Sequence, residues 1–400
     1  MSFETALTGL NAASADLDVT GNNVANSATI GFKYSRAEFA DIYASSNLGT
    51  ARTTVGQGVR LASVTQQFTQ GQFDFTGNTL DLAVNGTGFF ALGDDGAISY
   101  TRNGAFQLDR DGYIVDANGD RLIGYLAGSN GTIGGARGEL QVNIGNVAPK
   151  ASANISLSAN LDSGAAAITG AFDPTDPSTF HFTTSTTVYD AQGKDHLATL
   201  YFQKRSDNVW DIHVDGDDGT GAQGPATVTF NSNGKFASVA GTTTYAFNYG
   251  GAGTSNISVD FSSLTQYGSV FDVKELSQDG YAAGQFAGLG VESDGRILAQ
   301  FTNGQSQALG QVALSRFPSP QKLQPSGDTN WVETFESGAP VTSAPGSSGL
   351  GSIQGGALES SNVNLTEQLV QMITAQRNFQ ANSQMISTQD QITQEILNIR

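Results

Sequence analysis

The two ends of this 400-residue chain carry apolar residues at heptad spacing, whereas Asn-Gly and Asp-Gly dipeptides occur only between residues 85 and 304. Alternating steps of four and three residues place an apolar stripe along one side of an α-helix. Asn-Gly and Asp-Gly supply the positive φ angles of tight β-hairpin turns. The chain is therefore predicted to be mainly β, with one long helix at each end.

The apolar positions of the terminal segments define the two predicted helices. In the first segment Ser14 and Gly21 fill steps of the repeat, and Gly31 with Lys33 is expected to end the helix. In the second segment the register shifts once, after Ile386. We expect these positions to form the helical seam used in assembly: Phe3, Leu7, Leu10, Leu17, Val24, Leu365, Leu369, Met372, Phe379, Ile386, Ile392, Ile396 and Ile399.

The polar face of the second helix carries amides where charges are usual. Residues 361–400 contain eight Gln and five Asn but only five charged residues. A freely solvated helix face usually carries Glu and Lys. Amides can pack against protein without the desolvation penalty of a buried charge. The face is expected to pack against other protein or to line a wet lumen; a simple two-helix hairpin within one monomer is an equal alternative.

The middle of the chain is predicted to be an antiparallel β body. Asn-Gly and Asp-Gly each occur six times there. Alternating apolar residues flank several of these turns: Leu289 and Val291 precede Asp294-Gly295, and Ile297 follows it. Stretches rich in Gly, Ala, Ser and Asn at 127–171 and 240–256 divide the body, and a loose stretch at 338–356 precedes the second helix.

Pairing the two terminal helices makes the chain a nested hairpin of discontinuous layers. The predicted fold is mainly β, with long antiparallel, coiled-coil-like helices at the N- and C-termini and two antiparallel β domains. Its predicted parts are a helical domain (1–32 with 360–400), a connecting segment (33–72), a proximal β domain (73–144 with 281–359) and a distal inserted β domain (145–280).

Composition excludes several classes of function. The net charge is −18, which argues against a nucleic-acid partner. The chain has no Cys, and its three His stand at no metal-ligand spacing. No run of 18 apolar residues is present, so no membrane insertion is expected. We expect no enzyme activity and predict no catalytic, cofactor-binding or metal-binding residues.

Three motifs resemble those of bacterial flagellar rod and hook axial proteins. They cover residues 7–13 with 22–33, residues 80–90 with 101–106, and residues 361–367 with 374–382. Because the motifs are long and follow the order of the family, the resemblance is specific. The first two contain the positions that we single out: Asn23, Asn26, Thr29, Gly31, Phe32, Lys33, Asn85, Gly86, Gly88, Phe89, Phe90, Arg102, Asn103, Gly104 and Phe106.

The resemblance implies a tubular helical homopolymer in which paired terminal helices line an inner channel and β domains form outer layers. It implies an extracellular place in the flagellar hook or basal body, reached by flagellar type III export without a cleaved signal peptide. Phe3 and Leu7 are then also candidates for the export signal. The implied partners are further copies of the chain, the flagellar distal rod protein, the hook cap protein, the hook–filament junction protein and the export apparatus. No cofactor is implied.

Chain length separates the branches of this family. Rod proteins of this type look like shorter chains with one β domain, whereas residues 145–280 supply an additional domain here. The hook branch, whose members form a flexible tube that transmits torque, is therefore favoured. A distal rod protein is the main alternative, and a secreted carbohydrate-binding or adhesin β protein is a weaker one.

Overall fold

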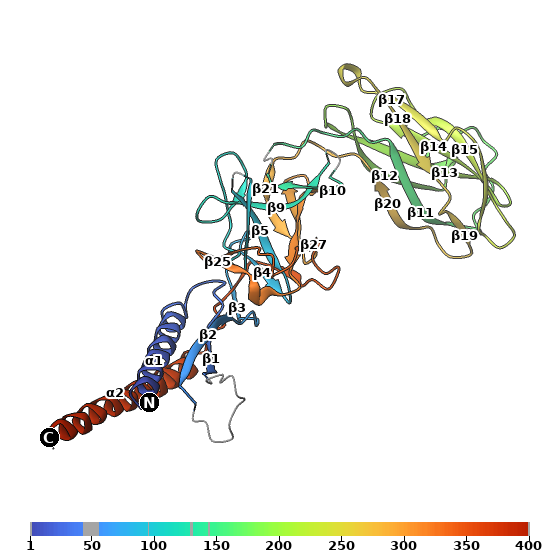
Figure 1. Cartoon of the computed structure of the whole chain (residues 1–400). Coiled ribbons are helices and arrows are strands. Elements are labelled where there is room, and N and C mark those ends of the chain that lie inside the picture. The colour runs from blue at the N-terminus through green and yellow to red at the C-terminus, as the bar shows by residue number, and fades with distance from the viewer. Residues whose placement is uncertain (1, 43–55, 95, 129–130, 143–144, 399–400) are drawn as a thin grey trace. The chain divides into compact units, whose positions relative to one another are not determined.

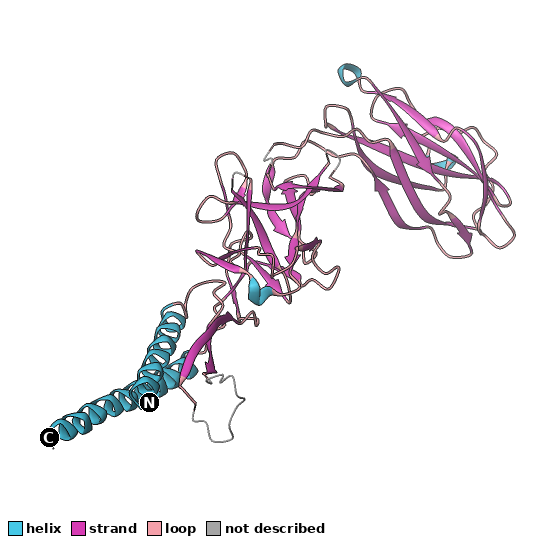
Figure 2. Cartoon of the chain, in the orientation of Figure 1, coloured by secondary structure: helices cyan, strands magenta, loops and turns pink. Residues whose placement is uncertain are grey.

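The computed structural model describes residues 2–42, 56–94, 96–128, 131–142 and 145–398. As predicted, the described chain is mainly β, with one long helix towards each terminus (Figures 1 and 2). It divides into two compact units. Unit 1 contains Met1–Ile144, Gly288–Gln300 and Ser306–Arg400, and unit 2 contains Gly145–Ala287 and Phe301–Gln305.

The helices are α1 (Ser2–Ala25) and α2 (Leu365–Asn398). The predicted stop at Gly31 and Lys33 was placed too late, because α1 ends at Ala25. Beyond that point the side chain of Asn26 donates to the carbonyl of Asn22, and the hydroxyl of Ser27 donates to that of Val24. Such short polar side chains compete with the helical backbone for hydrogen bonds, which explains the early end.

Unit 1 contains a sheet that joins strands from both halves of the sequence. Its main path runs β21-β22-β23-β9-β5-β6-β26-β25, and three further pairs, β1-β2, β28-β4 and β29-β3, lie outside it. The strands are β1 (Ser35–Asp41), β2 (Val59–Gln66), β3 (Phe73–Phe75), β4 (Leu82–Asn85), β5 (Phe89–Asp94), β6 (Ala97–Thr101), β7 (Gln107–Leu108), β8 (Ile114–Val115), β9 (Arg121–Ala127), β10 (Ile133–Glu139), β21 (Phe286–Val291), β22 (Arg296–Phe301), β23 (Ser306–Val312), β24 (Leu314–Arg316), β25 (Gln324–Gly327), β26 (Asn330–Val332), β27 (Val341–Ser343), β28 (Ser352–Gly355) and β29 (Ala357–Glu359).

Unit 2 contains two five-stranded sheets, β17-β18-β11-β19 with β20, and β12-β13-β14-β15-β16. One buried cluster draws side chains from both sheets, including Leu157, Trp210 and Phe247. The strands are β11 (Asn154–Asp162), β12 (Phe182–Tyr189), β13 (Asp195–Ser206), β14 (Val209–Gly216), β15 (Gln223–Phe230), β16 (Phe236–Gly241), β17 (Thr244–Asn248), β18 (Thr254–Asp260), β19 (Thr265–Tyr267) and β20 (Asp272–Gln278).

Two features of the β body differ from the prediction. Strand β11 pairs in parallel with β18 and with β19, so the body is not wholly antiparallel. The stretches 127–171 and 240–256 contain strands and do not act only as dividers. Small residues are compatible with strands wherever pairing and burial outweigh their weak β-propensity.

The turn dipeptides form two groups. Gly112, Gly119 and Gly295 have positive φ angles of 83°, 95° and 82°, as a tight turn requires. Gly104 is not among the positive-φ glycines, and a Cβ placed on it would lie 1.6 Å from the carbonyl oxygen of Leu82. Asn103-Gly104 is thus a site of close packing and not a hairpin turn.

Candidate functional site

Three charged side chains meet in the interior of unit 1. The Nζ of Lys33 lies 2.6 Å from Oε1 of Glu359, and Nη1 of Arg102 lies 3.1 Å from Oε2 of the same carboxylate. The exposed fractions of the three side chains are 0% for Lys33, 4% for Arg102 and 0% for Glu359. We call Lys33, Arg102 and Glu359 the buried ion cluster.

Each member of the buried ion cluster comes from a different part of the chain. Lys33 lies between α1 and β1, Arg102 directly follows β6, and Glu359 ends β29. Two of them belong to the sequence motifs. Glu359 was not predicted, because an acid that follows Ala357 and Leu358 gives no signal of pairing in sequence alone.

Hydrogen bonds satisfy most of the remaining polar atoms of the cluster. Lys33 Nζ donates to the carbonyl of Thr69 at 2.8 Å, and Arg102 Nη2 donates to that of Gly86 at 2.8 Å. Glu359 Oε1 also accepts from the backbone N–H of Gly71 at 2.8 Å. Burial lowers the pKa of Lys33 and of Arg102, and the Glu359 carboxylate opposes both shifts. One carboxylate therefore compensates two buried cations.

Backbone contacts bring the first two motifs and β29 together around the cluster. The N–H of Gly31 donates to the carbonyl of Glu359 at 2.8 Å. Gly31 has a φ of +71°, and a Cβ on it would lie 2.5 Å from the backbone nitrogen of Asn103. Because the backbone of Asn103 approaches so closely, position 31 has room only for glycine. The Arg102 guanidinium lies 5.3 Å from the ring centroid of Phe89.

A set of amides joins the helices to the strands. Asn23, which is buried, donates to Oε1 of Gln368 at 2.8 Å and exchanges two hydrogen bonds with the backbone of Ser35. Asn362 accepts from the N–H of Tyr34 and donates to the carbonyl of Gln67. These amides fix the base of both helices against β1 and the segment that follows β2.

The two helices run antiparallel. Asn23 contacts Gln368, and the Gly9 Cα faces the Asn382 side chain so closely that a Cβ would lie 2.6 Å from its Oδ1. The residue numbers of contacting pairs thus rise on one helix as they fall on the other. Small and polar side chains form much of this contact, including Ala6, Ala13 and Ala375, which are buried.

The predicted seam residues are not the centre of that contact. Leu7 lies two residues before Gly9, and Gly21 lies two residues before Asn23. Two residues correspond to about 200° around a helix, so Leu7 and Gly21 point nearly away from the contact with α2. None of the twelve described seam residues is fully buried. Those that are exposed are Phe3, Leu7, Leu365, Leu369, Ile392 and Ile396, those partly buried are Leu10, Leu17, Val24, Met372, Phe379 and Ile386, and Ile399 lies outside the described residues.

The other motif residues pack the β body or shape the turn after α1. Phe90 and Phe106 form an edge-to-face pair with centroids 5.3 Å apart, and Phe89 packs against Trp331 at 5.8 Å. Gly86 and Gly88 have positive φ angles. The remaining motif residues lie in the turn after α1, at the end of β4 or in connecting segments of unit 1: Asn26, Thr29, Phe32, Asn85, Asn103 and Gly104.

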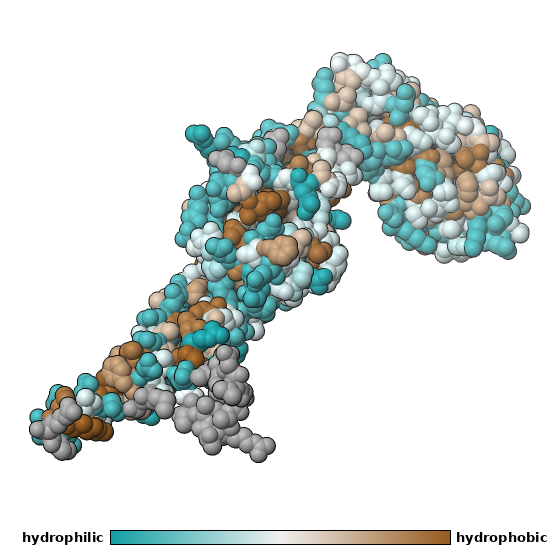
Figure 3. Space-filling view, viewed as in Figure 1, coloured by the Kyte–Doolittle hydropathy of each residue, from teal (hydrophilic) through white to brown (hydrophobic). Residues whose placement is uncertain are grey.

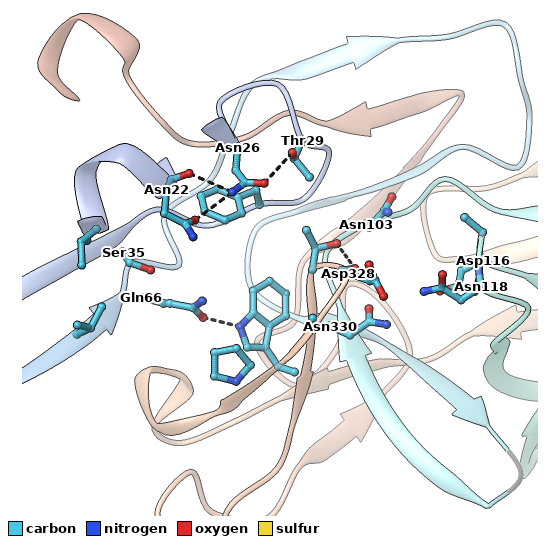
Figure 4. Close-up of a pocket in the computed structure, with 18 of the residues that line it drawn as sticks. Asn22, Asn26, Thr29, Ser35, Gln66, Asn103, Asp116, Asn118, Asp328 and Asn330 are labelled. Carbon is cyan, nitrogen blue, oxygen red and sulfur yellow. Dashed lines mark hydrogen bonds between the residues drawn. The ribbon is translucent and has the colours of Figure 1, made fainter. Parts of the chain in front are cut away.

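An open groove of about 750 Å³ lies between the end of α1, β2 and the β25-β26 turn (Figure 4). Its lining includes the amides of Asn22, Asn26, Gln66 and Asn330, and Trp331 donates its indole N–H to Gln66. The lining also includes three carboxylates, Asp18, Asp116 and Asp328, and neither Lys nor Arg.

Within the described residues, no cluster of three or more His, Asp or Glu side chains could hold a metal ion. No helix of the described chain is both long and apolar enough to cross a bilayer. In unit 1 a buried ion cluster and an amide network hold the base of two helices that expose several large apolar side chains.

Four family models match the chain. They are the flagellar basal body rod protein (residues 3–33), the flagellar hook protein FlgE/F/G D1 domain (83–161), the flagellar basal body protein FlaE D2 domain (160–281) and the flagellar basal body rod FlgEFG protein C-terminal (354–399). The third covers most of the predicted distal β domain, residues 145–280.

Relatives of full length are similar to the whole chain. The flagellar hook proteins FlgE of Salmonella typhimurium and of Escherichia coli K12 are each 38% identical, over 410 and 411 residues that cover 100% of each chain. FlgE of Borreliella burgdorferi is 32% identical and covers 100% of this chain and 99% of its own. The crystal structure of Helicobacter pylori flagellar hook protein FlgE2 covers 72% of this chain and 100% of its own, with a TM-score of 0.55 and 15% identity, which indicates a shared fold.

Proposed function

Because this chain belongs to the flagellar hook protein family, we propose that it polymerises through its terminal helices into a flexible helical tube that transmits torque. It is a structural subunit of the bacterial flagellar hook. The alternative of a rod protein loses its support, since relatives that match from end to end are hook proteins. The family is a structural one, and we expect no catalysis.

The observation that carries polymerisation is the uncovered apolar surface of the helices. Ten of the 22 exposed large apolar side chains among the described residues lie on them, two on α1 and eight on α2. Figure 3 shows apolar residues along the surface of the helix pair. Exposed apolar surface of this extent marks an interaction site. In a polymer of one chain, the partner is another copy.

The buried ion cluster gives the tube a means of transmitting torque to the β domains. A force on the helices reaches the sheet through Lys33 and Arg102, which share the carboxylate of Glu359. Because these charges are buried, solvent does not screen them as it screens surface pairs.

We propose that the chain forms three layers of the tube. Residues 1–32 with 360–400 form the inner layer, in which the helices act as a coiled coil, and residues 33–72 form a connection. Residues 73–144 with 281–359 form the middle layer, and residues 145–280 form the outer layer.

Further partners follow from a place in the hook. At its ends the polymer would meet the distal rod protein, the hook cap protein and the hook–filament junction protein. The flagellar type III export apparatus would carry the chain through the channel, with Phe3 and Leu7 as the candidate signal. Both side chains are exposed on α1 and accessible for such recognition.

Electron microscopy of the purified protein under polymerising conditions tests the main proposal. Tubes of hook-like curvature are expected, straight rods would favour the rod alternative, and the absence of any polymer would contradict both.

A variant without residues 148–283 tests the role of the outer layer. The N–H of Val147 donates to the carbonyl of Gly284 at 2.9 Å, so the cut ends already lie side by side. We expect its tubes to lose normal curvature and flexibility; unchanged tubes would refute a role for the outer layer in either property.

A further inference from the structure

We infer that the outward face of α2 in one copy of this chain docks on the outward face of α1 in a second copy, with Arg377 of the first against Asp18 of the second. This inference rests on the proposed polymer and goes further, since it names the two surfaces and the residues that align them.

The geometry of the helix pair defines these outward faces. Gly9 on α1 and Gln368 on α2 face the partner helix of the same copy. Asp18 and Arg377 each lie nine residues further along, which is two and a half helical turns. Both therefore point away from the intramolecular contact, and both are exposed.

The two outward faces have complementary charge. Arg377 is the one basic residue of α1 and of the described part of α2, and α1 carries only the acids Glu4, Asp16 and Asp18. The side chains of Asp18 and Arg377 make no ion pair or hydrogen bond among the described residues. A charge buried by assembly without a partner is costly, so each needs an opposite charge from another chain.

Apolar residues accompany the charge on each face. Leu7 lies three turns before Asp18 on the same side of α1, and Val370 and Ile373 lie seven and four residues before Arg377 on α2. All three apolar side chains are exposed. Each face is thus an apolar strip that carries charge. On α1 the charges are acidic, Asp18 and, about four turns earlier, Glu4, whereas on α2 the basic Arg377 lies beside the apolar side chains and the acid Glu395 lies about five turns further along.

Gly21 provides an independent observation. A glycine in the middle of a helix is destabilising, and a close approach of another backbone or side chain is the usual reason to keep one. Gly9 has such a neighbour in Asn382, but a Cβ on Gly21 would meet nothing within 4 Å. Among the described residues the space beside Gly21 is therefore open, and a second copy docked on this face would fill it.

An antiparallel register with Asp18 opposite Arg377 supplies that neighbour. It places Ile373 beside Gly21 and Val370 beside Ala25, so large side chains of α2 meet small residues of α1. The two surfaces are different, so the interface is heterologous, and repeating it generates an open helical polymer. That is the symmetry that a tube requires.

A charge swap tests the pairing in the full-length protein. We expect Asp18→Arg alone and Arg377→Asp alone to raise the critical concentration for polymerisation by about tenfold or more, because each places like charges together. We expect the double variant to return to within about threefold of wild type, as coupling between contacting residues requires. Sedimentation and electron microscopy below 0.1 M salt give the readout, since salt screens exposed pairs.

Two controls make the result specific. Glu4→Arg combined with Arg377→Asp keeps the same net charge as the matched swap but lies about 21 Å away along α1, and it should not restore assembly. Gly21→Leu should block polymerisation while leaving the unfolding midpoint of the monomer unchanged, because its side chain has open space within one copy. Circular dichroism of each monomer verifies folding.

The outcomes separate the two proposals. If the wild-type protein forms no polymer, the proposed function is wrong. If it polymerises but the single variants do too, or the matched swap restores no more assembly than the mismatched one, only this interface is wrong. Normal assembly of Gly21→Leu would likewise overturn it.

Discussion

Lys33 and Glu359 are joined by an ion pair of 2.6 Å between side chains that expose no surface, although 326 residues separate them in sequence. Arg102 completes the cluster on the other carboxylate oxygen. The contact therefore ties the start of the chain, the β body and the strand before α2 at one buried point. Its loss should affect the whole of unit 1.

Glu359→Gln should destabilise unit 1 by about 3–5 kcal/mol, because two cations are then left buried without a counter-charge. Urea unfolding measures this through the fluorescence of Trp331, with wild type and variant compared in a Trp210→Phe background so that unit 2 is silent. The exposed pair Lys322–Glu336, at 3.2 Å, offers the control Glu336→Gln, which should have little effect. Equal effects of the two variants would contradict the role of the cluster.

Asn23→Ala should loosen the base of the helix pair by about 2–3 kcal/mol, because it leaves the N–H of Ser35 without its partner and removes the bond to Gln368. In the wild-type monomer, amide hydrogen exchange within α2 should be slowest near Gln368 and fastest beyond residue 389. Beyond that residue, α2 extends past the N-terminal end of α1 and has no partner helix in the same copy. The variant should exchange rapidly along all of α2. Asn11→Ala, at an exposed position of α1, is the control. Slow exchange near Gln368 in the Asn23 variant would refute this account.

Gly104→Ala should destabilise unit 1 by about 3 kcal/mol or more, because its Cβ would meet the backbone of Leu82 and cannot be relieved by a side-chain rotation. Gly77→Ala is matched to it, since a Cβ at Gly77 meets nothing within 4 Å. Thermal unfolding should show a lower midpoint for the first variant and little change for the second. A tolerated Gly104→Ala would show that Asn103-Gly104 acts as an ordinary turn.

Asp279→Asn should destabilise unit 2 at neutral pH but not in acid. Burial alone would raise the pKa of Asp279, but the N–H groups of Ala153 and Asn154 and the Lys150 ammonium outweigh it and hold the pKa well below the ordinary 3.8. Because the folded pKa is depressed, the stabilisation is complete above the unfolded value and is lost as pH falls from about 3.8 towards the folded pKa. Unfolding followed by Trp210 fluorescence between pH 2 and 7 should show the gap between wild type and variant closing below pH 4.

The exposed side chain of Glu275, on β20, makes no hydrogen bond or ion pair among the described residues and supplies the control variant Glu275→Gln. Its stability should follow that of wild type across the same pH range. A gap between wild type and Asp279→Asn that stays constant with pH would mean that the carboxylate charge is not the cause.

Local patterns in the sequence were sufficient to predict the main elements. The heptad spacing from Phe3 to Val24 and from Leu365 to Ile396 predicted both helices, and Asp111-Gly112 and Asp294-Gly295 predicted hairpin turns that the structure contains. These signals succeed because helical period and positive φ depend on residues close in sequence. The motif residues Lys33 and Arg102 were also singled out, but their partner was not.

Tertiary structure decided which residues meet. A heptad pattern marks a stripe of like residues but not the chain that covers it, so the predicted seam could not be distinguished from the contact between α1 and α2. In the fold, the small residues at Gly9, Ala13 and Ala375 allow the helices to approach, and the larger Leu7 and Ile373 are left outward. Likewise Glu359 pairs with Lys33 and Arg102 only in the folded chain. A buried charge needs an opposite charge beside it, but the sequence does not show which distant residue will supply that charge.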